Sequence, residues 1–230
     1  AAGETDGGIK WKYAIDMDGT GATAADDQQI VLTLPTMGTI GIYISEGGID
    51  VDNSWDKSVY ARPSDTSYNE LKRDAFSIGD LNNVQYHTAA GMLPFGIVAK
   101  IAYAPNTADT TIADANSAGA SRTRAATNFG SATAYQITAA PIDGLSIGAN
   151  YMEVDEAGLS GTALIQEQES GAYYVKYDVG SVGLGYSKAY YAPQSGSAQT
   201  IEYYDQTNYS IAFNVNENLS VSYEVEKSDR

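Results

Sequence analysis

The chain is predicted to be all-β, and three observations favour an antiparallel, up-and-down transmembrane β-barrel. Apolar and polar residues alternate in stretch after stretch, most clearly in 9–16, 173–179 and 209–215. The stretches come in pairs joined by very short turns, and aromatic residues lie near their ends. A period of two places apolar side chains on one face of a strand and polar side chains on the other. Repeated along a whole chain, this pattern is typical of a membrane barrel with a polar interior.

The alternation predicts about eleven strands, which together form one domain over 1–230. They are expected at 8–16, 28–35, 38–46, 83–89, 95–104, 131–140, 144–153, 171–179, 182–191, 205–215 and 218–226.

The predicted connections alternate between short and long. Residues that form tight turns join the strands at 35–38, 91–94, 141–144, 180–181 and 216–218. Longer segments rich in Asp, Thr, Ser, Ala and Gly lie at 17–27, 47–82, 105–130, 154–170 and 192–204. Bacterial outer-membrane barrels have short periplasmic turns and long external loops. A soluble β-sandwich would show a less regular alternation.

Composition narrows the function classes. The net charge of -16 argues against nucleic acid and anionic membrane surfaces as partners, because both repel acidic proteins. The chain has no Cys, which excludes disulfides and thiolate metal sites. No run approaches the ~20 consecutive apolar residues that a transmembrane helix needs. The chain opens without an apolar leader, as a mature exported protein or a fragment would.

The segment 47–82 is expected to have a function of its own, because loops longer than about 15 residues without secondary structure usually do. It is too apolar to extend freely into water, and we expect it to pack against the inner wall of the barrel. Its apolar residues are Trp55, Tyr60, Tyr68, Leu71, Phe76 and Ile78.

The arrangement of these segments resembles that of the general diffusion porins of Gram-negative outer membranes, most closely the alphaproteobacterial ones. The residues that support the resemblance are 29–34 and 38–43, the long segment that follows, and then 83–87 and 95–103. The resemblance implies about sixteen strands, a constriction loop folded into the barrel at about 47–82, and a homotrimer. It also implies passive diffusion of small hydrophilic solutes and ions. In that family the constriction loop follows the fifth strand, whereas 47–82 follows the third predicted strand, and the chain ends without the aromatic-ended strand that closes such barrels. We therefore expect the sequence to be incomplete at both ends.

Porin selectivity comes from opposed charges across the constriction. The resemblance implies an acidic side from the long loop, at Asp50, Asp52, Asp56, Asp65, Glu70 and Asp74. Alternation assigns the basic side to the polar face of the strands, at Lys10, Lys12, Lys100 and Lys176. A lysine facing lipid near mid-bilayer would cost ~2–4 kcal/mol, which favours this assignment. Within the loop, Arg62, Lys72 and Arg73 could pair with its acids, and Trp55 and Phe76 would anchor it. The acidic mouth predicts a preference for cations or zwitterions.

No cofactor is predicted. Asp16 and Asp18 look faintly like the start of a calcium loop, but the third acidic position and the terminal Glu of an EF-hand are missing. Divalent cations such as Ca²⁺ could also bridge acidic external loops to outer-membrane lipid or lipopolysaccharide. His87 is the one histidine, and a barrel hydrolase would need a Ser and an Asn or Asp to converge on it. No motif indicates that convergence, so the chain is not predicted to be an enzyme.

Two aromatic belts are expected at headgroup depth. Tyr103, Tyr151, Tyr190 and Tyr191 lie toward the long-loop ends of strands, and Phe95, Tyr177 and Phe213 lie nearer the short turns. Two alternatives stay open. A soluble or surface-attached β-sandwich adhesin would pack its apolar faces together, and an outer-membrane barrel enzyme would need a site around His87.

Overall fold

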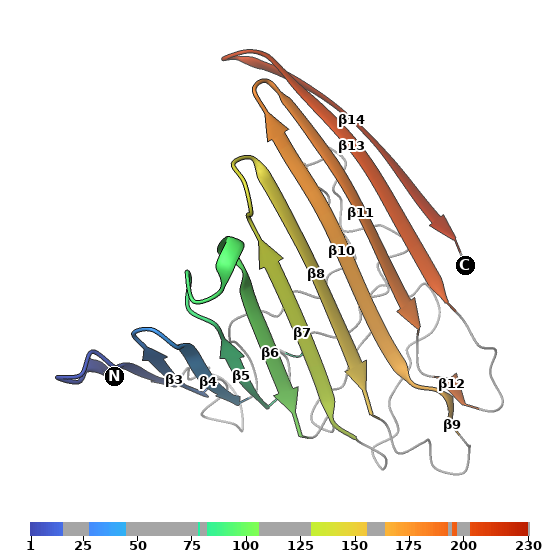
Figure 1. The fold of residues 1–230 in the computed structure, drawn as a ribbon. Coiled ribbons are helices and arrows are strands. Elements are labelled where there is room, and N and C mark those ends of the chain that lie inside the picture. Colours follow the sequence, from blue (N-terminus) through green and yellow to red (C-terminus); the bar gives the residue numbers. More distant parts are fainter. Residues whose placement is uncertain are drawn as a thin grey trace, which may run out of the picture.

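The structure is a computed structural model that describes residues 1–15, 28–44, 78, 82–105, 130–155, 164–192, 195–196 and 203–229. The described chain is all-β, with one antiparallel, up-and-down sheet of twelve strands in which neighbours in sequence are neighbours in space (Figure 1). The strands are β1 (Ala2–Glu4), β2 (Lys10–Ile15), β3 (Gln28–Leu34), β4 (Gly38–Ile44), β5 (Asn83–His87), β6 (Val98–Ala104), β7 (Ala132–Ala139), β8 (Leu145–Val154), β10 (Gln168–Val179), β11 (Val182–Ala192), β13 (Tyr204–Asn216) and β14 (Leu219–Asp229). A second ladder pairs β9 (Leu164–Gln166) with β12 (Ser195–Gly196).

All eleven predicted strands are present, with differences at their ends. The strand expected at 95–104 begins at Val98, because Pro94–Gly96 forms a short 3-10 turn, η2, with Phe95 in the left-handed region at φ 59. The final strand continues to Asp229, since it pairs with β13 along its whole length. The strands β1, β9 and β12 were not predicted, because two or three residues are too few to show a period.

The two faces of the sheet differ in a way that is inverted relative to a water-soluble protein. The face that we call the apolar face exposes large hydrophobic side chains, among them Ile211 and Phe213 at 47% each. On the opposite face, which we call the polar face, Gln85 is 1% exposed and Asn208 is 2% exposed. Large contiguous exposed apolar surfaces mark sites that contact another apolar surface or medium.

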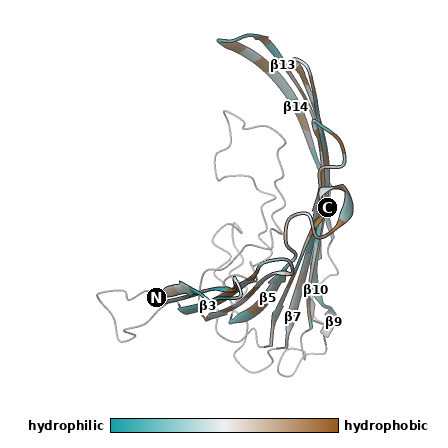
Figure 2. Cartoon of the chain, turned by 60° about the vertical axis from the view of Figure 1, so that its left-hand side comes forward, coloured by the Kyte–Doolittle hydropathy of each residue, from teal (hydrophilic) through white to brown (hydrophobic). Residues whose placement is uncertain are grey.

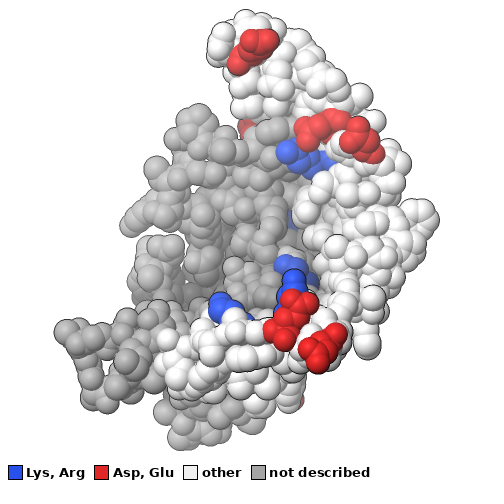
Figure 3. Space-filling view, turned by 90° about the vertical axis from the view of Figure 1, so that its left-hand side faces the viewer, with Lys and Arg blue, Asp and Glu red and all other residues white. Residues whose placement is uncertain are grey.

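The sheet is curved, and the polar face lies on its hollow side (Figures 2 and 3). Its edges are β1 and β14, which do not pair with each other in the described part of the chain. We call the ends of the strands at the turns 35–37, 180–181 and 217–218 the short-turn ends, and the opposite ends the long-loop ends. In Figure 1 the short turns step steadily upward from β3–β4 to β13–β14. Among the described residues, no helix is long and apolar enough to cross a membrane.

Three aromatic rings lie across glycines on the neighbouring strand. Trp11 covers Gly3, Tyr174 covers Gly148, and Tyr190 covers Gly171, each ring facing its direct Cα partner. A Cβ added at Gly3 would lie 2.8 Å from the Trp11 ring, and one added at Gly171 would lie 2.7 Å from the Tyr190 ring. These glycines are required because any side chain would displace the aromatic ring.

Candidate functional site

The four lysines assigned to the pore wall lie on the polar face of β2, β6 and β10. In Figure 3 basic side chains gather in the hollow of the sheet, while acidic side chains gather toward its rim. Lys12 Nζ donates to Gln29 Oε1 at 3.4 Å, and Lys176 Nζ lies 3.4 Å from Asp178 Oδ2. The described polar face therefore carries these four lysines together with acids, since Glu4 is the Cα partner of Lys10, Asp178 lies beside Lys176 and Glu224 lies on the same face of β14. The role of this face as a pore wall stays a prediction.

A continuous polar row crosses this face from β2 to β8. Each member is the Cα partner of the next, in the order Lys10, Thr33, Thr39, His87, Lys100, Gln136 and Asn150. The hydroxyls of Thr33 and Thr39 lie 3.3 Å apart, and Asn150 Oδ1 accepts a hydrogen bond from the backbone N–H of Ala172 at 2.8 Å. The row sets donors and acceptors in register across the polar face, and its member His87 is buried.

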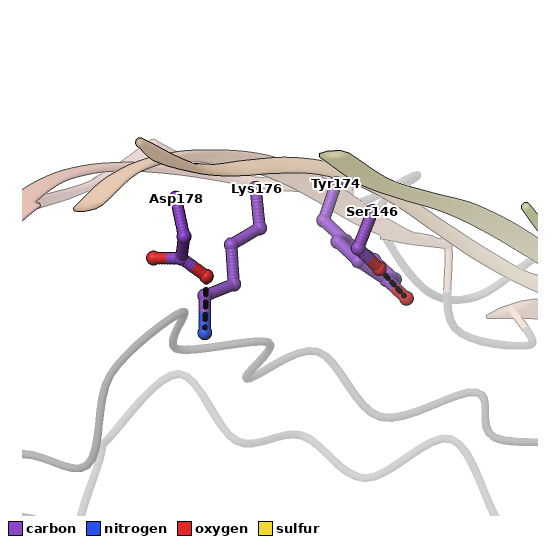
Figure 4. A network of polar contacts seen from close by, with 4 residues as sticks. All are labelled: Ser146, Tyr174, Lys176 and Asp178. Carbon is purple, nitrogen blue, oxygen red and sulfur yellow. Dashed lines mark hydrogen bonds and ion pairs between the residues drawn. The ribbon is translucent and has the colours of Figure 1, made fainter. Parts of the chain in front are cut away.

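Next to Asn150, a small polar network extends the wall onto β8 and β10 (Figure 4). Tyr174 Oη lies 3.5 Å from Ser146 Oγ, and both side chains lie on the same side of the sheet as Lys176 and Asp178. The Tyr174 ring lies flat against the wall because its strand partner is Gly148. The lysine thus projects beside an aromatic ring and a hydroxyl, a surface suited to polar solutes.

The lone histidine lies in the polar row. His87 is 6% exposed, and its Nε2 lies 2.9 Å from Gln85 Oε1. A hydrolase would need a nucleophile and an acidic or amide residue on the two ring nitrogens. An amide oxygen on Nε2 occupies the nitrogen that would activate a nucleophile, which favours a structural role for His87.

An alanine-rich patch lies on the polar face toward the long-loop ends of β6, β7 and β8. Its buried members are Ala102, Ala104, Ala132, Ala134, Met152 and Val154. Ile78 belongs to the same buried cluster, and its carbonyl accepts a hydrogen bond from Asn83 Nδ2 at 3.1 Å. Ile78 is thus the described residue of segment 47–82 that packs on the inside of the sheet. The patch was not predicted, although the alternate alanines of 102–104 and 132–134 were a usable signal.

The aromatic residues divide between the faces. Tyr103, Tyr151 and Tyr190 lie on the apolar face toward the long-loop ends, as expected. Tyr191 lies on the polar face instead, 6% exposed, with its ring stacked on Tyr204 at a centroid distance of 6.3 Å. Adjacent residues of a strand cannot share a face, so the expectation for Tyr191 was wrong.

Seven of the tyrosines on the apolar face form an inclined line from β6 to β14, which we call the tyrosine line. Tyr13, Tyr86, Tyr177 and Tyr190 lie on the same face but off this line. The members of the line are Tyr103, Tyr135, Tyr151, Tyr173, Tyr186, Tyr209 and Tyr223. At four of the six steps between strands, the next tyrosine lies two residues closer to the short-turn end. The line therefore shifts by about eight residues along the strands while it crosses six strand spacings. At about 3.3 Å per residue and about 4.8 Å per strand, the line is inclined by about 40° from the direction perpendicular to the strands.

The remaining predicted site residues lie outside the described part of the chain. They are Asp16, Asp18, Asp50, Asp52, Trp55, Asp56, Arg62, Asp65, Glu70, Lys72, Arg73, Asp74 and Phe76. Among the residues that are described, no group of three or more His, Cys, Asp or Glu could hold a metal ion. A scan against models of known protein families gives no match for this chain, and a search of curated proteins gives none either.

Proposed function

We propose that the chain forms the wall of a bacterial outer-membrane porin, a water-filled channel for passive diffusion of small hydrophilic solutes and ions. The observation that supports this most is the inclination of the tyrosine line. Strands of transmembrane barrels tilt by ~35–45° from the membrane normal, and aromatic girdles lie at the membrane surfaces. A girdle in the membrane plane must then cross successive strands obliquely, at about the angle found here.

The two faces fit the two environments of such a channel. The apolar face would meet hydrocarbon, where its exposed Ile, Leu, Val and aromatic side chains cost nothing. The polar face would line water, which satisfies the lysines and the polar row. A β-sandwich offers no such account, because it would bury these apolar faces against each other.

In this proposal the lysines of the polar face act on permeating ions. Lys10, Lys12, Lys100 and Lys176 place positive charges on the described wall beside the acids Glu4, Asp178 and Glu224, and the predicted acidic side belongs to segment 47–82. Charges that face each other across a narrow pore decide which ions pass. The homotrimer, the contact with lipopolysaccharide and the preference for cations belong to this same proposal.

The test is conductance across a planar bilayer that contains the detergent-extracted protein. We expect stepwise currents, with a reversal potential set by the salt gradient. Lys100→Glu should shift that potential toward cation preference, because the charge lies on the water-filled side. The matched variant Lys227→Glu makes the same change on the apolar face near a long-loop end and should leave the potential unchanged. Absence of current, with protein that stays in solution without detergent, would refute the channel.

A further inference from the structure

A small cavity lies on the polar face beside the ring of Tyr174, and we call it the Tyr174 cavity. Its volume is about 30 Å³. Ala149 has its side chain on the apolar face, so it meets the cavity with its backbone. A volume of this size holds about one water molecule or one hydroxyl group. The residues that line it are Gln136, Thr138, Ala149, Asn150, Ala172 and Tyr174.

Two small residues create the cavity. Gly148 is the Cα partner of both Thr138 and Tyr174. Ala172 lies two residues from Tyr174 on the same face of β10. Since neither small residue carries more than a methyl group, a space remains between the side chains of β7 and the Tyr174 ring. The glycine also lets that ring lie along the wall, with its hydroxyl oxygen 3.5 Å from Ser146 Oγ (Figure 4).

The lining offers hydrogen-bonding groups without charge. Asn150 Oδ1 accepts a hydrogen bond from the backbone N–H of Ala172 at 2.8 Å, which orients the amide beside the cavity. Gln136 and Thr138 add an amide and a hydroxyl from β7. None of the lining residues is a Lys, Arg, His, Asp or Glu. The cavity therefore suits a hydroxyl group, which both donates and accepts hydrogen bonds.

Lysines border the cavity on two sides. Lys100 is the Cα partner of Gln136. Lys176 follows Tyr174 on the polar face of β10, and its Nζ lies 3.4 Å from Asp178 Oδ2, which balances its charge. A ligand above the cavity thus meets a neutral surface between two basic side chains. This arrangement favours a neutral ligand, and an anion is the alternative that an experiment must exclude.

We propose that the Tyr174 cavity is a subsite for a neutral sugar. A sugar combines an apolar C–H face with hydroxyl groups at its edge, which matches a half-exposed aromatic ring bordered by amides. The C–H face would lie on the Tyr174 ring, and one hydroxyl would enter the cavity beside Thr138 and Asn150. The inference rests on the proposed function, because it requires the polar face to line water that solutes reach.

Saturation-transfer NMR tests the proposal on protein extracted in a detergent without a sugar headgroup. The probes are methyl α-glucoside, which has a closed ring, sorbitol, which has hydroxyls but no ring, and gluconate, which is an open-chain anion. We expect methyl α-glucoside to bind about fivefold more tightly than sorbitol or gluconate, since it alone has a C–H face that can lie on an aromatic ring.

Variants locate the binding. Tyr174→Ala removes the ring and should weaken methyl α-glucoside binding about fivefold, whereas Tyr174→Phe keeps the ring and should bind as the unaltered chain does. Thr138→Val replaces the hydroxyl by a methyl group of similar size and should weaken binding about threefold. The matched variant Tyr173→Ala removes a ring from the apolar face of the same strand and should leave binding unchanged.

Equal binding of methyl α-glucoside and sorbitol would overturn the inference, as would equal losses in Tyr174→Ala and Tyr173→Ala. Tighter binding of gluconate would overturn it too, because it would assign the binding to the bordering lysines. Planar-bilayer currents of the same samples separate the two proposals. Currents without sugar binding refute the subsite and leave the channel standing, and sugar binding without currents does the reverse.

Discussion

One row of neighbouring residues across the sheet is apolar at one end and acidic at the other. The row, which we call the Trp11 row, links successive Cα partners on the apolar face from β2 to β14. Its β2–β4 end consists of Trp11, Leu32 and Ile40, all exposed and apolar. Its β11–β14 end consists of Tyr190, Asp205 and Asp229. Residues that are successive Cα partners across the sheet therefore face different surroundings at the two ends of the row.

The difference shows that the apolar band does not run perpendicular to the strands. In β2 the band reaches Ile15, beyond the Trp11 row, whereas in β14 it stops at Val225, short of that row. The boundary thus moves about eight residues over ten strand spacings, which corresponds to about 30°. This estimate and the 40° of the tyrosine line agree in direction, as expected when strands are inclined to a flat apolar layer.

The largest expected effect comes from placing the same charge at both ends of the Trp11 row. Leu32→Arg would put a guanidinium inside the apolar band, and we expect it to lower the free energy of unfolding from lipid vesicles by ~2–4 kcal/mol. Asp229→Arg would put it beyond the band, where the cost is ~0–1 kcal/mol. Urea titration of both variants measures the difference. Equal costs would show that the row lies at one depth.

A smaller effect on stability is expected when a glycine beneath an aromatic ring is replaced by alanine, on the polar face in one variant and on the apolar face in the other. Gly148→Ala would drive a methyl group into the Tyr174 ring, and this overpacking should cost about 1–2 kcal/mol and change channel conductance. Gly171→Ala, against Tyr190 on the apolar face, should cost a similar amount and leave conductance unchanged. Adding Tyr174→Ala to Gly148→Ala should remove the strain. If both glycine variants change conductance alike, the two faces do not meet different environments.

The smallest effect is expected at the acidic β11–β14 end of the Trp11 row. Lys188 Nζ lies 3.9 Å from Asp205 Oδ2, with the two side chains 40% and 53% exposed. Exposed pairs of this kind contribute little, so Lys188→Gln should lower stability by about 0.5 kcal/mol, and less at high salt. Stability at two salt concentrations measures it. A loss of several kcal/mol would place this pair inside hydrocarbon and move the boundary of the band.

The sequence predicted the features that depend on the alternation of side chains within a single strand. Alternation was sufficient for eleven strands and for the faces of Lys10, Lys12, Lys100 and Lys176, since a period of two fixes the side of every residue. Alternation failed at Phe95, where Pro94 and Gly96 favour a turn. At Tyr191 the assignment was wrong because it did not follow alternation, which places Tyr190 and Tyr191 on opposite faces.

The inclination of the apolar band and the shallow apolar depression over Ala99 and Ala149 could not be predicted from the sequence. Both depend on the register between strands, and β6 and β7 are separated by a long connection whose length does not fix it. Ala99, Ile137 and Ala149 become neighbours through that register. The alanine-rich patch beneath Ile78 was missed for a different reason, since the alternate alanines of 102–104 and 132–134 were present in the sequence but were not interpreted as a packing surface.

The rings that lie across glycines have a consequence for how this chain can vary. Gly171 can gain a side chain only after Tyr190 has been replaced by a smaller residue, and a Cβ there would still lie 3.2 Å from the Asn150 carbonyl oxygen; Gly148 depends on Tyr174 in the same way. Each pair is therefore inherited as a unit, with the aromatic residue lost before the glycine is free to change. Related chains should keep both members or lack both, and the two columns should covary in any alignment that contains them.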